Sequence, residues 1–271
     1  MPEGKRRIKL TLSYDGTAYH GWQEQDDALS VQEVISRTLS AILGEETEVF
    51  GSGRTDAGVH ALGQVAHFDT TRRIAAEKFS IILNSRLPSS IRILSSEEPD
   101  GVFHARFTAM AREYWYFIKD WNDMLPFDDG RYTAVRNLPD ISILNEYAAL
   151  IRGTHDFTTF CSARDMCQSK WRDIYESVWT EETDGWGKPF LKYKVTGNAF
   201  LYHQVRSMVG TMVDCALKRE SGDEFRARLD SKDRERALRT YPSAGLYLAR
   251  ISYDENEYSW FEEENNGRES D

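Results

Sequence analysis

Apolar and polar residues follow two different spacings along the first third of the chain. Residues 8–14 alternate apolar and polar side chains, which predicts a strand with one buried face. Residues 30–43 carry apolar side chains at helical spacing, with Ser30 and Glu33 placed as a capping box and Gly44 as a stop. The remaining pattern predicts three strands over 47–50, 62–69 and 91–94, and a helix over 75–85.

The rest of the chain repeats this order of elements. A strand is predicted over 114–119 and a helix over 140–152, closed by Gly153. Two strands, a long apolar helix, one or two further helices and a last strand are expected over 174–181, 190–196, 199–218, 222–238 and 246–253. Both parts therefore run strand, helix, strands, helix, strand. This order predicts two α+β units, each a sheet with helices packed on one face.

We expect an N-terminal domain over 1–104, a second domain over 105–253, and an acidic, mobile tail over 254–271. The tail holds eight acidic residues and one basic residue, and so accounts for −7 of the net charge of −10. Because only −3 remains for everything before it, the overall charge does not exclude a nucleic-acid partner. A basic cleft can coexist with an acidic average field.

Composition narrows the class of protein further. A hydrophobic fraction of 40% is enough to bury a core, which argues against a disordered chain. No apolar run approaches the roughly twenty residues that span a bilayer, and the N-terminus enters a strand pattern without a signal peptide. Cys161, Cys167 and Cys215 cannot form a closed disulfide set, which favours a reducing cytoplasm.

The stretch GSGRTDAGVHALGQVAHF, residues 51–68, is the richest in candidate chemistry. It lacks the glycine spacing of a dinucleotide-binding loop and the Gly-Lys-Ser/Thr ending of a P-loop, and its histidines lack metal-ligand spacing. Arg54 and Asp56 lie two residues apart in a loop that glycines allow to bend sharply. From the residues alone, Asp56 is a turn residue, a partner of Arg54 in a local salt bridge, or a catalyst.

This stretch closely resembles the signature of the tRNA pseudouridine synthase A family. The similarity continues through YDGTAYHGWQ with SVQE, FHARFTAMAREYWYF, GTHDFTTFC, GNAFLYHQVRSMVG and AGLYLARISY, in order from about residue 8 to residue 253. The resemblance implies an α+β fold of two ferredoxin-like or RRM-like halves. It also implies that a continuous, mainly antiparallel sheet joins the halves and that the active-site cleft lies between them.

The family isomerises uridine to pseudouridine within tRNA, which requires no cofactor and no metal. By resemblance Asp56 is the essential carboxylate, and it could attack C1′ of the ribose, add to C6 of the base, or take a proton from C2′; the sequence leaves all three open. Arg206 occupies the family position that pairs with the aspartate. A carboxylate that stays ionised in a dry pocket needs such a positive partner. Arg54 occupies the position of the residue that helps to evict the target base.

Tyr114 falls at the first tyrosine of the family's RxYxY block, and the resemblance gives it the role of stacking on the flipped uracil. Strand alternation places Trp115 on the opposite face, where the family often has a polar or basic residue. Four histidines near the blocks have no assigned catalytic role, and we interpret them as loop hydrogen-bonders or RNA contacts: His60, His67, His104 and His203.

The resemblance implies a cytoplasmic homodimer whose subunits together bind one tRNA, with no membrane partner and with uridines 38–40 of the anticodon arm as targets. Three alternatives stay open. They are a non-catalytic RNA-binding protein on the same fold, a synthase with a different uridine target, and an enzyme acting on a small nucleotide.

Overall fold

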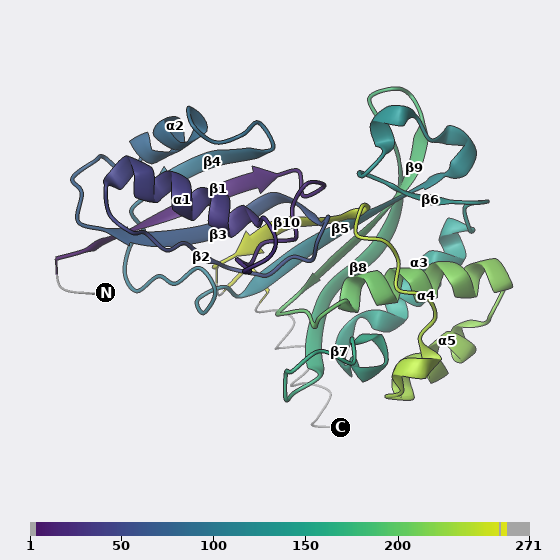
Figure 1. Cartoon of the computed structure of the whole chain (residues 1–271). Helices are drawn as coiled ribbons and strands as arrows, with labels where there is room; N and C mark the ends of the chain where they lie inside the picture. Colours follow the sequence, from purple (N-terminus) through teal and green to yellow (C-terminus); the bar gives the residue numbers. More distant parts are fainter. Residues whose placement is uncertain (1–3, 255, 259–271) are drawn as a thin grey trace. The chain divides into compact units, whose positions relative to one another are not determined.

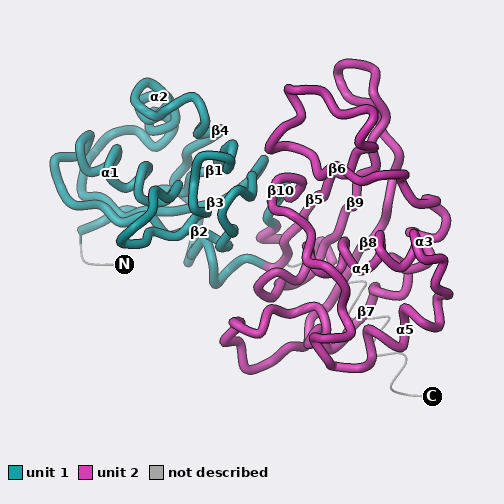
Figure 2. Tube along the Cα trace, turned by 45° about the vertical axis from the view of Figure 1, so that its right-hand side comes forward, with its two compact units in different colours: residues 1–109, 247–251 teal, residues 110–246, 252–271 magenta. Residues whose placement is uncertain are grey.

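The computed structural model describes residues 4–254 and 256–258, which fall into two compact units (Figures 1 and 2). Unit 1 comprises residues 1–109 and 247–251, and unit 2 comprises 110–246 and 252–271. Apart from residues 254 and 256–258, the acidic tail predicted over 254–271 lies outside the described residues.

Unit 1 is built on a central strand with neighbours on both sides. The strand β1 (Arg6–Tyr14) pairs antiparallel with β3 (His60–Thr70) and with β4 (Ile91–Glu97). The two-residue strand β2 (Phe50–Gly51) also pairs with β3. The helices α1 (Val31–Leu43) and α2 (Lys78–Asn84) pack on this sheet (Figure 1).

The last strand of the chain, β10 (Leu246–Ser252), returns to unit 1. It runs parallel to β3, with Tyr247 opposite His60 and Leu248 opposite Ala61. The sequence predicted this strand correctly, but nothing in its local pattern indicated that its partner lies almost two hundred residues earlier in the chain.

The ends of α1 follow the predicted chemistry only in part. The Ser30 hydroxyl accepts a hydrogen bond from the Glu33 backbone N–H at 3.1 Å, and Gly44 closes the helix with a φ of 67°. The Glu33 carboxylate forms an ion pair with Arg37, one turn later, and this contact takes the place of the reciprocal half of the capping box.

The strand expected over 47–50 is wrong in extent, because only its last residue joins the ladder. The Thr47 N–H donates to the Ser40 hydroxyl at 2.9 Å, and the Val49 carbonyl accepts from the Gln32 amide at 2.9 Å. Side chains of α1 therefore satisfy backbone groups that a longer strand would have paired. The helix expected over 75–85 is also shorter, at Lys78–Asn84.

Unit 2 contains four strands that run antiparallel to their neighbours, and a fifth that is parallel to the first of them. Their order is β5 (Ala111–Asp120), β9 (Pro189–Gly197), β8 (Trp171–Thr183) and β7 (Gly153–Asp156), with β6 (Thr133–Val135) on β5. The helices of unit 2 are α3 (Ile141–Ile151), α4 (Gln204–Lys218) and α5 (Gly222–Asp230). Short 3₁₀ turns lie at Trp121–Asp123, Pro126–Asp128, Thr158–Phe160 and Arg234–Arg236.

Several boundaries in unit 2 differ from the prediction. The helix expected over 199–218 begins only at Gln204, because His203 adopts a left-handed φ of 65°. The stretch 222–238 forms one α-helix and one 3₁₀ turn. Gly153 begins β7 and does not close α3, which ends at Ile151 with Arg152 as its C-cap. The short strands β6 and β7 were not predicted at all.

The α+β class, with mainly antiparallel strands and helices packed on them, is confirmed. Among the described residues, no helix combines the length and the apolar character needed to cross a membrane.

Candidate active site

The Arg54–Asp56 loop is fixed to the strand that follows it. The Ser52 N–H donates to the Val65 carbonyl at 2.8 Å, and the Gln64 side-chain amide donates to the Gly53 carbonyl at 2.9 Å. Because Gln64 and Val65 belong to β3, the first half of the loop is held against a sheet strand.

A second set of contacts comes from the segment after β1. The Trp22 N–H donates to the Thr55 carbonyl at 3.2 Å, and the Gly58 N–H donates to the Tyr19 carbonyl at 3.1 Å. The hydroxyls of Tyr14 and Thr55 lie 2.8 Å apart in the interior. The stretch YDGTAYHGWQ therefore holds the loop in place, and two of the blocks that carry the family resemblance are in contact.

Two glycines make this close approach possible. A Cβ on Gly16 would lie 2.0 Å from the Val59 carbonyl oxygen, and one on Gly21 would lie 2.2 Å from that of Thr55. Gly21 also adopts a φ of +83°, which other residues rarely adopt. A side chain at either position would push the loop away from the segment that holds it.

Asp56 lies in a tight turn closed by its own carbonyl, which accepts from the Val59 N–H at 3.1 Å. Thr55 and Val59 on either side are buried, whereas Arg54 is exposed and Asp56 is half-buried. Hydrogen bonds therefore hold the backbone of the turn in place, and Asp56 itself is only partly removed from solvent.

His60 supports the same region. The His60 side chain is buried. Its Nδ1 accepts from the Gly16 N–H at 3.1 Å and lies 3.4 Å from the Asp15 carboxylate. Its ring stacks on Tyr247 of β10 with centroids 4.5 Å apart. These contacts tie the end of the Asp56 loop to the segment after β1 and to the strand β10.

His67 and His104 also accept hydrogen bonds from loop backbone. His67 Nδ1 accepts from the Ala105 N–H at 3.2 Å, and His104 Nδ1 accepts from the Arg106 N–H at 3.1 Å. Burial lowers the pKa of His67 to about 4, with smaller contributions from Arg7 and His104. Burial lowers the pKa of His104 as well. Both rings therefore remain neutral acceptors at neutral pH.

The other two candidate residues belong to unit 2. Tyr114 lies on β5 opposite Val195 and is half-exposed, and its ring meets Phe200 edge-on with centroids 5.1 Å apart. Arg206 is the third residue of α4, and its Nε donates to the Tyr241 carbonyl at 2.8 Å. The Tyr241 N–H donates back to the Arg206 carbonyl at 3.1 Å.

The side chain of Trp115 contacts Glu113 and Lys192, whereas the ring of Tyr114 contacts Phe200. Its indole N–H donates to the Glu113 carboxylate at 2.6 Å, and the Lys192 ammonium lies 3.9 Å from the ring centroid. Its next neighbour, Tyr116, is fully buried and donates to the Pro242 carbonyl at 2.7 Å. The alternation predicted along this strand places the charged contacts of Trp115 away from the buried ring of Tyr116.

The site residues thus fall into two groups, with Arg54 and Asp56 in unit 1, and Tyr114 and Arg206 in unit 2. The pairing of Asp56 with Arg206 stays a prediction. Sequence reasoning missed the residues that hold the Asp56 loop, chiefly Tyr14, Gly16, Thr55 and Gln64. The signal for them was the YDGTAYHGWQ block, which lies far from the loop in sequence. Among the described residues, no group of three or more His, Cys, Asp or Glu side chains could hold a metal ion.

Comparison with known proteins defines the class of protein. Residues 11–108 and 147–254 match the family model described as tRNA pseudouridine synthase. These ranges include both groups of site residues except Tyr114. The chain belongs to the tRNA pseudouridine synthases, and it is accordingly an isomerase.

The relatives define the branch of that class. The chain is 41% identical to tRNA pseudouridine synthase A of Bacillus subtilis over 252 residues, which cover 92% of this chain and 99% of the relative. It is 39% identical to tRNA pseudouridine synthase A of Acetivibrio thermocellus over 250 residues, which cover 92% and 100%. The chain therefore belongs to the tRNA pseudouridine synthase A family, and the family predicted from the ordered blocks is confirmed.

Proposed function

We propose that this protein converts uridine to pseudouridine at positions 38–40 of the anticodon arm of tRNA, with Asp56 as the essential carboxylate. The observation that carries the proposal is the construction of the Asp56 loop. The strand β3 and the YDGTAYHGWQ segment hold the loop in place, while Asp56 stays half-buried. A catalytic group held by rigid neighbours in this way suits a reaction that demands accurate positioning.

The reaction is an isomerisation in which no atom is gained or lost overall. The bond between ribose C1′ and base N1 breaks, the base turns, and a bond forms between C1′ and C5. The hydrogen on C5 leaves as a proton to solvent, and N1 takes up a proton. Asp56 acts in its ionised form, as nucleophile or as base toward C1′, C6 or the C2′ proton. No cofactor or metal takes part.

Three further residues act around Asp56 in this proposal. Arg54, exposed on the same loop, takes part in displacing the target nucleotide from the stem, a step that costs a few kcal/mol. Tyr114 stacks on the displaced uracil. Arg206 serves as counter-ion to Asp56, through a guanidinium whose Nε is anchored on the Tyr241 carbonyl.

The substrate is tRNA, which the protein binds in the cytoplasm as a homodimer. The blocks that match the family run from residue 8 to residue 253, so the acidic tail is not required for chemistry. The net charge of −3 before the tail supports RNA binding better than the overall −10 suggests.

Tritium release tests the proposal. A tRNA transcript carrying tritium at C5 of uridine is incubated with the wild-type protein, with Asp56→Asn and with Asp100→Asn. We expect release by the wild type and by Asp100→Asn, an exposed aspartate elsewhere in unit 1. Asp56→Asn should lose about a thousandfold in rate or more while still binding tRNA.

The outcomes separate the alternatives. Binding of tRNA without tritium release by the wild type would identify a non-catalytic RNA-binding protein. Release from free uridine nucleotides but not from tRNA would identify an enzyme of small nucleotides. Release by Asp56→Asn at the wild-type rate would contradict the role of Asp56.

A further inference from the structure

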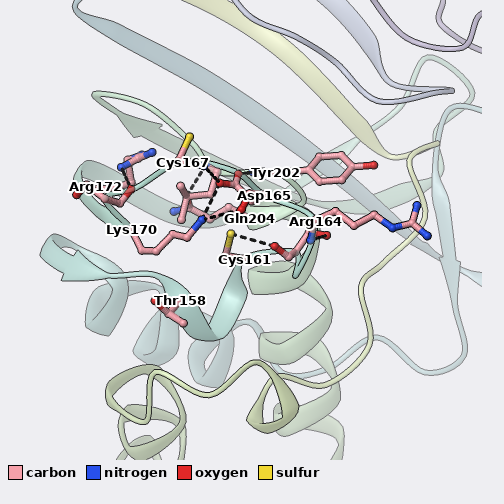
Figure 3. A network of polar contacts seen from close by, with 12 residues as sticks. Thr158, Cys161, Arg164, Asp165, Cys167, Lys170, Arg172, Tyr202 and Gln204 are labelled. Atoms are coloured by element: carbon pink, nitrogen blue, oxygen red, sulfur yellow. Dashed lines mark hydrogen bonds and ion pairs between the residues drawn. The ribbon is translucent and has the colours of Figure 1, made fainter.

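The loop over residues 162–170 of unit 2 is tied to the segment that leads into α4 (Figure 3). The Ser162 N–H donates to the Tyr202 carbonyl at 2.9 Å, and the Tyr202 N–H donates to the Asp165 carboxylate at 2.7 Å. Two stretches that are almost forty residues apart in sequence are thus joined at a single residue, Tyr202.

The Asp165 carboxylate is fully engaged in this junction. Besides Tyr202, it accepts from the Cys167 N–H at 2.8 Å and from the Lys170 ammonium at 2.7 Å. Its side chain is only 6% exposed. Burial alone would raise the pKa of Asp165, but Lys170 and the two backbone N–H groups lower it to about 2. A buried, fully bonded carboxylate specifies the geometry of the loop closely.

The segment that leads into α4 is constrained from the other side as well. His203 adopts the left-handed region, with a φ of 65°, which is uncommon for residues other than Gly, although His adopts it more often than most. The Leu201 N–H donates to the side-chain carbonyl of buried Gln204 at 2.8 Å. A strained conformation persists only where its surroundings over-determine it, and such strain is often found at functional sites.

The junction presents two side chains to solvent. Arg164 is exposed, and its backbone N–H donates to the Ser162 hydroxyl at 3.3 Å. The ring of Tyr202 is 40% exposed. Figure 3 shows both side chains extending from the network toward the same side. Within residues 4–254 and 256–258, no carboxylate pairs with the Arg164 guanidinium.

We propose that Asp165 is a positioning residue which, with Lys170, holds Arg164 and Tyr202 as a contact for the RNA strand that flanks the target uridine. A planar cation suits a phosphate, and an exposed aromatic ring suits an unpaired base. The inference rests on the proposed function, because Tyr202 lies four residues before Arg206, the proposed counter-ion of Asp56.

The first experiment measures kcat and KM for tRNA in the tritium-release assay. Arg164→Ala should raise KM about fivefold and Tyr202→Ala about tenfold, with kcat within about twofold of the wild type. Arg164→Ala should also reduce the slope of log affinity against log salt concentration by about 1. Arg152→Ala, which removes an exposed arginine elsewhere in unit 2, should leave KM unchanged.

A double-mutant cycle tests positioning by Asp165. Asp165→Ala should raise KM at least as much as Tyr202→Ala in the wild-type background, but less than twofold in a protein that already carries Arg164→Ala and Tyr202→Ala. A purely structural role would raise KM equally in both backgrounds, and that result would overturn the inference. Where Asp165→Ala lowers the yield of folded protein, Asp165→Asn and Lys170→Met are run through the same cycle.

The two proposals fail in distinguishable ways. If the wild type releases tritium normally but Arg164→Ala and Tyr202→Ala leave KM unchanged, the inference is wrong and the proposed function stands. If the wild type releases no tritium, the proposed function is wrong. The inference is then tested by tRNA binding, with Arg164→Ala and Tyr202→Ala each made in the Asp56→Asn protein. Weaker binding than that of Asp56→Asn supports the inference, and equal binding contradicts it.

Discussion

Asp56 has one of the roles that the sequence presented as alternatives, that of a turn residue, and the proposed function adds the role of catalyst. Its backbone carbonyl closes a turn with the Val59 N–H, which is the structural role expected of an aspartate in a glycine loop. Its side chain is meanwhile half-buried between the buried residues Thr55 and Val59. Local pattern alone could not choose between turn residue and catalyst, because the same residue type serves both. The family resemblance was needed to favour catalysis.

The histidines illustrate the same limit at the scale of a single residue. The sequence placed His60 and His67 near a candidate site but could not show that each Nδ1 accepts a hydrogen bond from a backbone N–H. The donors, Gly16 and Ala105, are about forty residues distant along the chain. Contacts of this range are invisible to a search for short motifs.

His67 makes the stability of unit 1 sensitive to acid. Its pKa of about 4 lies below that of an unfolded histidine, so the unfolded chain binds a proton that the folded protein does not. Stability should fall as the pH drops from 6.5 to 4, by about 3 kcal/mol from this group. The other charged or titratable groups that act on the ring are Arg7, Asp69 and His104. All three are unchanged in the variant described next.

Urea unfolding at pH 7, 5.5 and 4 measures this effect. The comparison is with His67→Asn, whose side-chain carbonyl can accept from the Ala105 N–H but does not titrate. Between pH 7 and pH 4, the free energy of unfolding should fall by about 3 kcal/mol less in the variant than in the wild type. An equal loss in the two proteins would contradict the assignment.

At the scale of elements, the sequence predicted the structure correctly where neighbouring residues form the hydrogen bonds at the end of an element. The helix α1 matched because Ser30 caps it and Gly44 ends it in a left-handed conformation. The start of α4 did not match, because the side chain of Gln204 bonds the Leu201 N–H and the backbone turns at His203. The short strands β6 and β7 carry too few residues to show an alternating pattern.

The contact between the Asp56 loop and the segment after β1 should be intolerant of a single methyl group. In Gly16→Ala the new Cβ would lie 2.0 Å from the Val59 carbonyl oxygen, so the loop must shift. We expect a loss of about 1–3 kcal/mol of stability together with a lower kcat for tritium release. Thermal unfolding and the tritium assay measure the two effects.

Gly185→Ala is the matched control, because a Cβ at Gly185 meets nothing within 4 Å and this glycine has no left-handed φ. It should behave as the wild type in both assays. A Gly16→Ala protein with wild-type kcat would show that the segment after β1 does not position Asp56.

At the scale of the whole molecule, the order of elements predicted two α+β units, but not every pairing or interior contact. The strand β10 joins β3 in parallel, although it is the last strand of the chain. Lys119, a charged residue on a predicted strand, is fully buried between Asp128 at 2.7 Å and Asp184 at 2.5 Å. Such an ion-paired lysine is invisible to a pattern that assigns charged residues to the surface.

The uneven distribution of charge has a consequence for tRNA binding. Truncation after Tyr258 removes five acidic residues and one basic residue. The shortened protein should bind tRNA several-fold more tightly at low salt, and the difference should shrink as salt screens the charges. A full-length variant with the five acidic residues changed to Gln or Asn separates charge from length and should bind like the truncated protein. Equal affinity of all three at low salt would show that the tail charge does not affect binding.

A map of pseudouridine in tRNA tests the central claim most directly. An unmodified tRNA transcript with uridines at 38–40 and elsewhere is incubated with the wild type, with Asp56→Asn or with buffer. Pseudouridine is then located by carbodiimide adducts that stop reverse transcription. The account predicts new stops at positions 38–40 with the wild type alone. Stops that persist with Asp56→Asn, or that arise only outside the anticodon arm, would contradict it.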